Sequence, residues 1–292
     1  MNEYFDTLYD WWKNIDKSIF FLICIFFLLG LFFSLASTSI IASNKLNTNS
    51  YYFFLKHFSF VSIGVIIILI FSLLNQKILI NLSILLFLFA LITLFLVPLI
   101  GVEVKGSKRW LDVGILPRFQ PIETLKPFFV IVISLLLSSD KKNLYFKCFI
   151  SAFILLPTII LLLAQPDLGQ TLLLTSVWLT VVFVSGINLI LFSFSLLTVS
   201  SLTFYLIFFV PKFEYIKIRL LSFLDTSGGN NYQADKASDA ISNGGFFGKG
   251  IGEGTLNTRI PEAHTDYIMS VIAEEFGVII VIGIILLYLI FS

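Results

Sequence analysis

Residues 168–211 read LGQTLLLTSVWLTVVFVSGINLILFSFSLLTVSSLTFYLIFFVP, and no Asp, Glu, Lys or Arg interrupts them. A membrane-spanning helix needs about 20 apolar residues, because each residue adds about 1.5 Å across a hydrocarbon core about 30 Å thick. This run of 44 residues therefore predicts two spans. Gly186-Ile187-Asn188 is the expected break between them, since glycine and asparagine favour turns.

Other runs without charged residues predict the remaining spans. They cover 18–44, 57–76, 78–102, 127–139, 148–166 and 276–292. Together the runs predict an all-α polytopic membrane protein with eight transmembrane helices. A large polar loop, 211–266, separates the seventh helix from the eighth.

Two of the runs are too short to span a membrane alone, so their helices must begin earlier in the sequence. The first of these helices must start near Ile122, which places Glu123 and Lys126 in its first turns. The last helix of the chain must start near Ile268 and include Glu274 and Glu275.

The composition supports a membrane protein. Hydrophobic residues make up 58% of the 292 residues and charged residues only 13%, and the mean hydropathy is +0.97. Soluble chains carry roughly 25% charged residues, so a soluble enzyme, a disordered tail and a secreted disulfide scaffold are excluded. Residues 1–17 mix acidic and basic side chains, which favours a retained first helix over a cleavable signal peptide.

The distribution of Lys and Arg does not give the orientation. In the shorter loops these residues divide six to six between the two sides of the membrane, so the excess expected on the cytoplasmic side is missing. Basic residues on the outer side are therefore candidates for binding an anion. Lys45, Lys56 and Lys212 are better explained as side chains that reach the interface from helix ends.

The first polar segment lies around residues 106–126. Lys108, Arg109 and Trp110 suit a lipid headgroup, because the indole prefers the interface and the cations pair with phosphate; the alternative is an ordinary interfacial anchor. Glu123 and Lys126 are three residues apart on one helical face and can pair. A functional pair at membrane depth competes with a buried structural pair.

Two further segments interrupt the apolar pattern. In 165–170, Pro166 is expected to end one helix and Asp167 to cap the next, although Asp167 could instead face a cavity. Residues 243–254 are rich in glycine but match neither the Walker phosphate loop nor the dinucleotide fingerprint. They predict a backbone that folds closely against a helix or a substrate.

The strongest catalytic candidate is Asp266, at the boundary of the last apolar run. In a helix, Asp266, Ser270 and Glu274 would share one face and carry two carboxylates toward the membrane. This pattern favours a functional role for Asp266 over a cap. Glu262 and His264 lie beside it, and a surface position is the alternative for His264.

These segments resemble the SEDS family of polytopic cell-wall polymerases, the FtsW, RodA and SpoVE group, and most closely its FtsW branch. The resemblance is carried, in the family's order, by G-S-K-R-W (106–110), Q-P-x-E-x-x-K (120–126), Q-P-D-L-G (165–169), G-G-x-F-G-K-G-x-G-x-G (244–254), P-E-A-H-T-D-Y-I (261–268) and A-E-E-F-G (273–277).

The resemblance implies a fold of ten helices with both ends in the cytoplasm. Residues 1–17 are then a cytoplasmic tail and 18–292 a transmembrane domain, with 101–121, 165–169 and 211–266 outside the cytoplasm. Eight of the ten helices are expected here, so the chain is expected to be truncated at its C-terminus and inactive by itself.

The resemblance also implies a peptidoglycan glycosyltransferase that polymerises lipid II in the bacterial cytoplasmic (inner) membrane at the division septum. The expected partners are a class B penicillin-binding protein and divisome proteins, and no nucleic acid. The family's essential aspartate falls on Asp266, the expected general base. The other expected site residues are Lys108, Arg109, Trp110, Lys249, Glu262 and His264 for the substrate, and Glu123, Lys126, Asp167 and Glu274 for the cavity.

A divalent cation, Mg²⁺ or Mn²⁺ held by oxygen ligands, is an alternative means of neutralising the pyrophosphate. A lipid II flippase is the alternative function, followed by a RodA-like elongation polymerase and a scaffold for the penicillin-binding partner. A flippase needs charges through the membrane midplane. The middles of the apolar runs carry almost none, which favours the enzyme.

Overall fold

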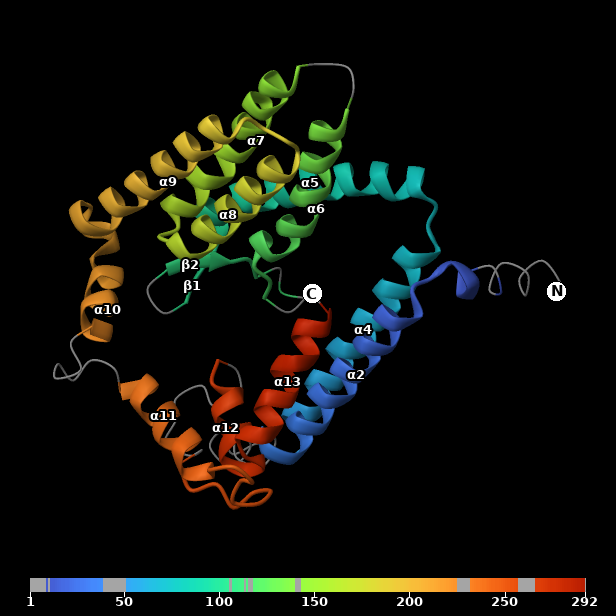
Figure 1. The fold of residues 1–292 in the computed structure, drawn as a ribbon, viewed down its shortest axis with the longest axis vertical. Helices are drawn as coiled ribbons and strands as arrows, with labels where there is room; N and C mark the ends of the chain where they lie inside the picture. The colour runs from blue at the N-terminus through green and yellow to red at the C-terminus, as the bar shows by residue number, and fades with distance from the viewer. Residues whose placement is uncertain are drawn as a thin grey trace. The chain divides into compact units, whose positions relative to one another are not determined.

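The computed structural model describes residues 9, 11–38, 51–104, 107–112, 114, 118–139, 143–224, 232–256 and 266–291. The chain forms two compact units. One unit comprises residues 75–221, and the other combines 1–74 with 222–292. Each unit is described by itself (Figure 1).

The unit of residues 75–221 is a helical bundle that carries a small hairpin. Its elements are α5 (Gln76–Ile100), β1 (Val102–Val104), β2 (Ser107–Trp110), α6 (Pro121–Ser138), α7 (Leu144–Ala164), α8 (Leu168–Val184), α9 (Leu189–Phe209), η2 (Pro211–Phe213) and α10 (Glu214–Leu224), which crosses the boundary of the unit. The two strands pair antiparallel. The bundle core comes from α5, α6, α7 and α8.

Helix α6 shows how the sequence builds this core. Its residues Ile122, Leu125, Phe129, Ile133 and Leu137 are all buried, at the spacing of three and four that places side chains on one face of a helix. Burying such a side chain contributes about 1.5–3 kcal/mol where the alternative is water. The spacing of the apolar residues in α6 therefore determines which face of the helix packs against α5, α7 and α8.

The other unit contains α2 (Lys17–Phe33), η1 (Ser34–Thr38), α4 (Tyr52–Leu73), α11 (Tyr232–Gly244), α12 (Ile268–Phe276) and α13 (Val278–Phe291). Helices α2, α4 and α13 lie side by side, and α12 packs against α11 (Figure 1). Phe33, Ile272 and Ile284 form an apolar core that joins α2, α12 and α13.

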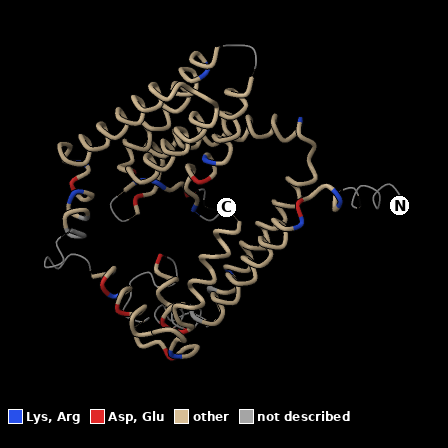
Figure 2. Tube along the Cα trace, viewed as in Figure 1, with Lys and Arg blue, Asp and Glu red and all other residues tan. Residues whose placement is uncertain are grey.

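The all-α membrane fold is confirmed. Among the described residues, six helices are long and apolar enough to cross a membrane, and α8 and α13 are shorter apolar helices. In the long apolar helices the charged residues lie toward the helix ends, and the middles of α5, α7 and α9 carry none (Figure 2). The ten-helix count stays a prediction.

The predicted break at 186–188 is confirmed: α8 ends at Val184, and the Asn188 side chain accepts a hydrogen bond from the backbone N–H of Ile190 at the start of α9. The predicted start of α6 is also confirmed, because the helix begins at Pro121 and holds Glu123 in its first turn.

The predicted helix start near Ile268 is confirmed by α12, but the prediction that this helix continues unbroken through the last apolar run is wrong. Helix α12 ends at Phe276, and Gly277 has a φ of +85°, which glycine tolerates and other residues rarely adopt. Helix α13 begins at the next residue. The pattern of charges could not show this break, because the segment that stabilises it comes from elsewhere in the chain.

That segment is glycine-rich, residues 244–250. The backbone N–H groups of Lys249 and Gly250 donate to the carbonyls of Glu274 and Glu275, at 2.9 and 3.1 Å. On the other side of the break, Val278 N–H donates to a carbonyl of the same segment, that of Gly245, at 3.0 Å. The segment therefore supplies hydrogen-bond partners that the broken helix no longer provides for itself.

Gly244 has to be a glycine for this contact. A Cβ atom there would overlap the carbonyl oxygen of Ala273. We expect Gly244→Ala to lower the free energy of unfolding by roughly 1–3 kcal/mol, as overpacking does. Gly283→Ala is the control, because a Cβ there meets no described atom within 4 Å and should be neutral or slightly stabilising. Thermal unfolding in detergent measures both; equal midpoints would contradict the close packing.

Candidate functional site

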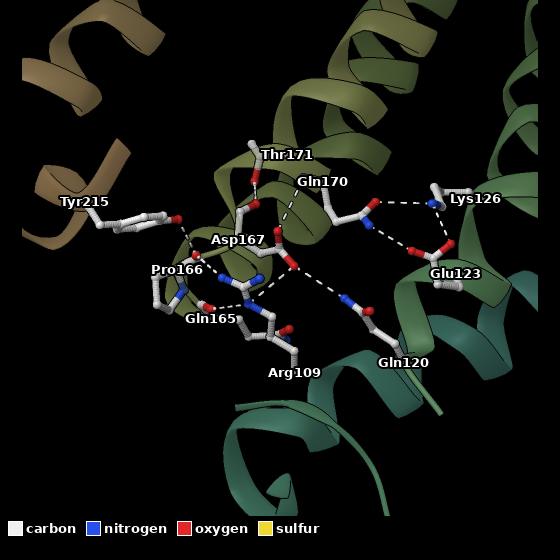
Figure 3. Close-up of polar contacts among 10 residues, drawn as sticks. All are labelled: Arg109, Gln120, Glu123, Lys126, Gln165, Pro166, Asp167, Gln170, Thr171 and Tyr215. Carbon is white, nitrogen blue, oxygen red and sulfur yellow. Dashed lines mark hydrogen bonds and ion pairs between the residues drawn. The ribbon is translucent and has the colours of Figure 1, made fainter. Parts of the chain in front are cut away.

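Asp167 is the centre of a polar cluster where α6 meets the start of α8 (Figure 3). Its carboxylate accepts from the backbone N–H of Gln170 at 3.4 Å and from Gln120 Nε2 at 3.3 Å. The Nε atom of Arg109 lies 3.5 Å from Asp167 Oδ2. Asp167 is buried, and its predicted role as the N-cap of α8 is confirmed.

Arg109, at the end of β2, reaches the turn between α7 and α8. It donates from Nη2 to the carbonyl of Pro166 at 2.7 Å and from Nε to that of Gln165 at 3.4 Å. Lys212 Nζ donates to the carbonyl of Ala164 at 2.9 Å. These two cations lie at the C-terminal end of α7, where the helix dipole favours positive charge.

Glu123 and Lys126 form the predicted ion pair, 2.7 Å between Oε2 and Nζ. A residue to which the sequence assigned no role connects them: Gln170 Nε2 donates to Glu123 Oε1 at 2.8 Å, and Lys126 Nζ donates to Gln170 Oε1 at 3.2 Å. The available signal was the position of Gln170, three residues after Asp167, on the same face of α8. Gln170 thus links α8 to the ion pair on α6 (Figure 3).

The hairpin does not place Lys108, Arg109 and Trp110, which are adjacent in the sequence, on one face. Side chains alternate between the two faces of a strand, so Lys108 and Trp110 point away from the face of Arg109. Lys108 is exposed, opposite Glu103 in the strand register, and Trp110 is partly buried. Arg109 is thus in contact with Asp167, whereas Lys108 remains at the surface.

Asp266 lies in the other unit and is exposed. It precedes α12, whose N-cap is Tyr267, so the prediction that Asp266 shares one helical face with Ser270 and Glu274 is wrong for Asp266. Ser270 and Glu274 are both buried on α12. A side chain used as an N-cap would be tied to the first turn, so the position of Asp266 outside the cap leaves its carboxylate accessible.

The remaining predicted residues fall in the same unit. Lys249 is exposed, and its backbone N–H is bound to the carbonyl of Glu274. Glu262 and His264 lie outside the described residues. Within the described part of the chain, no group of three or more His, Cys, Asp or Glu side chains could hold a metal ion.

The turn after the hairpin contains an exposed ion pair, Arg118 Nε to Asp112 Oδ2, at 2.9 Å. This hydrogen bond from Arg118, followed by the one from the backbone N–H of Gly114, lowers the pKa of Asp112 below its ordinary 3.8. A lowered pKa in the folded state means that the contribution of Asp112 to stability is present above pH 3.8 and is lost as the pH falls through the lowered pKa.

We therefore expect Arg118→Gln to move the pKa of Asp112 back toward 3.8. The titration of ¹³C-labelled Asp carboxyl groups by NMR, compared between wild type and variant, measures the change. An unchanged Asp112 titration in the variant would show that Arg118 is not the main cause of the shift.

Gln170→Leu removes both hydrogen bonds that join α8 to the Glu123–Lys126 pair. We expect a loss of roughly 1 kcal/mol in the free energy of unfolding, at the low end for hydrogen bonds to charged groups because Glu123 is half exposed. Ser176→Ala, an exposed position on the same helix, is the control. If both variants unfold at the wild-type temperature in detergent, the bridge contributes nothing to stability.

The sequence profile of the family described as "Cell cycle protein" (FtsW, RodA, SpoVE) matches residues 16–292. The chain is 29% identical over 274 residues to the "Probable peptidoglycan glycosyltransferase FtsW" of Caulobacter vibrioides, covering 92% of this chain and 68% of that protein. It is 32% identical to the protein of the same name from Coxiella burnetii, covering 84% and 67%. It is 34% identical to the protein of that name from Xanthomonas oryzae, covering 71% of this chain and 43% of that protein.

Two solved structures share the fold. A chain of a peptidoglycan synthase complex, studied for the coordination of polymerisation and crosslinking, aligns with a TM-score of 0.71 and 24% identity, covering 95% of this chain and 76% of that one. The rod shape determining protein RodA of Thermus thermophilus aligns with a TM-score of 0.62 and 23% identity, covering 96% and 73%. Because the family profile covers almost the entire sequence, this multi-pass membrane protein belongs to the FtsW, RodA and SpoVE family.

Proposed function

We propose that this chain is the membrane domain of a peptidoglycan glycosyltransferase that polymerises lipid II into glycan strands. The names of its relatives support the activity. The observation that carries the chemistry is the position of Asp266, an exposed carboxylate just before α12, the helix that leads into the apolar helix α13. A sugar hydroxyl from a membrane-anchored substrate can approach a carboxylate in this position.

In the proposed reaction the 4-hydroxyl of one sugar attacks the anomeric carbon of another. The new bond joins this oxygen to the anomeric carbon, and the bond from that carbon to the lipid pyrophosphate breaks. Asp266 accepts the proton of the attacking hydroxyl, and the pyrophosphate departs with the bonding electrons. General-base catalysis of this kind contributes about 10²–10⁴-fold to the rate.

Arg109 is proposed to hold the departing pyrophosphate. A guanidinium has five N–H donors, and the turn between α7 and α8 uses one on Nε and one on Nη2. The side chain is still 29% exposed, so the other donors can reach a ligand. The other residues proposed to bind the substrate are Lys108, Trp110, Lys249, Glu262 and His264.

Glu123, Lys126 and Asp167 in one unit and Glu274 in the other are proposed as cavity residues that keep the polar segments of their own unit in place. A divalent cation, Mg²⁺ or Mn²⁺, would need several oxygen ligands, and the described residues do not provide a cluster of three acids. We assign no step to such a cation.

The proposed location is the bacterial cytoplasmic (inner) membrane at the division septum, with residues 1–17 in the cytoplasm and 211–266 outside it. The proposed partners are a class B penicillin-binding protein and divisome proteins. The structural likeness to a chain of a peptidoglycan synthase complex supports such an assembly. The likeness to RodA keeps an elongation polymerase as the second candidate role.

A lipid II flippase would move a charged headgroup through the middle of the membrane. Helices α5, α7, α8 and α9 carry no charged residue in their central turns, so they offer no partner for pyrophosphate at that depth. This observation favours polymerisation over transport.

The test of the activity is polymerisation of labelled lipid II by the complete protein with its penicillin-binding partner. We expect Asp266→Asn to reduce the rate by about 10²–10⁴-fold, as loss of a general base does. Asp235→Asn, an exposed acid on α11, should polymerise like the wild type.

Three outcomes separate the candidates. Long glycan from the wild type and the Asp235 variant, but not from a folded Asp266 variant, supports the proposed base. Equal polymer from all three proteins would remove Asp266 from this role. No polymer from the wild type, together with movement of lipid II across a vesicle membrane, would favour the flippase.

A further inference from the structure

Glu274 is one of two buried carboxylates of α12, with an exposed fraction of 0%. Its Oε1 atom accepts three hydrogen bonds: from Asn243 Nδ2 at 2.9 Å, and from the backbone N–H groups of Thr255 and Leu256, each at 3.0 Å. Among the described residues, Oε2 has no hydrogen-bond partner. The three donors therefore converge on one oxygen atom.

These donors lie at the two ends of one segment. Asn243 precedes the glycine-rich residues 244–250, and Thr255 and Leu256 follow them. The middle of the segment is bound to α12 through backbone hydrogen bonds, including that from Lys249 N–H to the Glu274 carbonyl. Glu274 of α12 is thus hydrogen-bonded to the beginning, the middle and the end of the segment.

The fastened end of the segment is packed beside the proposed base. Leu256 and Tyr267 both pack against a small apolar cluster formed by Ala240 and Val271. Tyr267 directly follows Asp266 in the chain. Residues on both sides of 257–265 are therefore held at the same cluster, one through Leu256 and the other through Tyr267.

We propose that Glu274 is a positioning residue for Asp266. By binding the N–H groups of Thr255 and Leu256, Glu274 fixes Leu256 on the cluster that also holds Tyr267, and so fixes where the carboxylate of Asp266 lies. This inference rests on the proposed function, because it assigns Asp266 to the reaction. Glu274 touches no reacting atom.

The three hydrogen bonds to Glu274 Oε1 form a clamp on the segment, and two substitutions of Glu274 affect it differently. Glu274→Gln keeps a carbonyl oxygen toward the three donors and can place its NH₂ where Oε2 has no partner among the described residues. Glu274→Leu removes the acceptor and leaves three donors unpaired. Glu253→Gln is the control, an exposed acid in the same segment.

Hydrogen–deuterium exchange of the complete protein tests the clamp without any substrate. We expect the amides of Thr255 and Leu256 to exchange at least about tenfold faster in Glu274→Leu, because their hydrogen bonds to the buried carboxylate are lost. Glu274→Gln should lie between Glu274→Leu and the wild type, and Glu253→Gln should match the wild type. Unchanged exchange of both amides in Glu274→Leu would overturn the clamp.

Lipid II polymerisation tests the positioning. Per folded, monodisperse protein, Glu274→Leu should lower kcat by up to about 10²-fold, the effect of a misplaced catalytic group, with KM changed less than about twofold. Glu274→Gln should restore much of kcat. A merely structural role would lower the yield of folded protein and leave kcat per folded molecule unchanged.

The outcomes separate this inference from the proposed function. No polymer from the wild type overturns the proposed function and with it the role of Glu274. Normal polymer from the wild type and an unchanged kcat in Glu274→Leu overturn the positioning role alone. If Glu274→Leu does not fold, Glu274→Gln replaces it: a kcat equal to that of the wild type, despite exchange of the Thr255 and Leu256 amides that is clearly faster than in the wild type, overturns the role.

Discussion

A backbone N–H or C=O group inside a bilayer has no water to bind, so every interruption of a helix there needs a partner from the protein. A helix end likewise leaves carbonyl groups without partners inside the helix, and this chain supplies donors to several of them from other elements. Arg109 and Lys212 donate hydrogen bonds to backbone carbonyls at the C-terminal end of α7. The buried Lys147 donates to the carbonyls of Leu137 and Ser139 at the end of α6, at 2.6 and 2.7 Å.

The same contacts organise the polar residues that carry the proposed chemistry. Arg109 reaches Asp167 because both meet at the turn after α7, and Asp167 in turn connects to α6 through Gln120. In the other unit, the segment that Glu274 binds also supplies hydrogen-bond partners at the break between α12 and α13. In each unit, a buried acid thus joins a helix to another segment of the chain.

Local patterns predicted the features that depend on neighbouring residues in the sequence. The apolar period gave the buried face of α6, and the position of Asp167 after a proline gave the cap of α8. The break at Gly277 could not be predicted, because its hydrogen-bond partners precede it by more than 25 residues. The roles of Gln170 and Lys147 could not be predicted for the same reason. Their side chains bind a carboxylate or a carbonyl that is distant in the sequence, and only the fold brings these groups together.

The contact at Gly244 has a consequence for how this family can change during evolution. The methylene group of Gly244 lies against the backbone of Ala273 and Glu274, not against their side chains. A backbone carbonyl is the same for every residue type, so no replacement at position 273 can make room for a larger residue at 244. The two positions should therefore not co-vary among relatives, although they touch, and contact prediction from paired substitutions would overlook them.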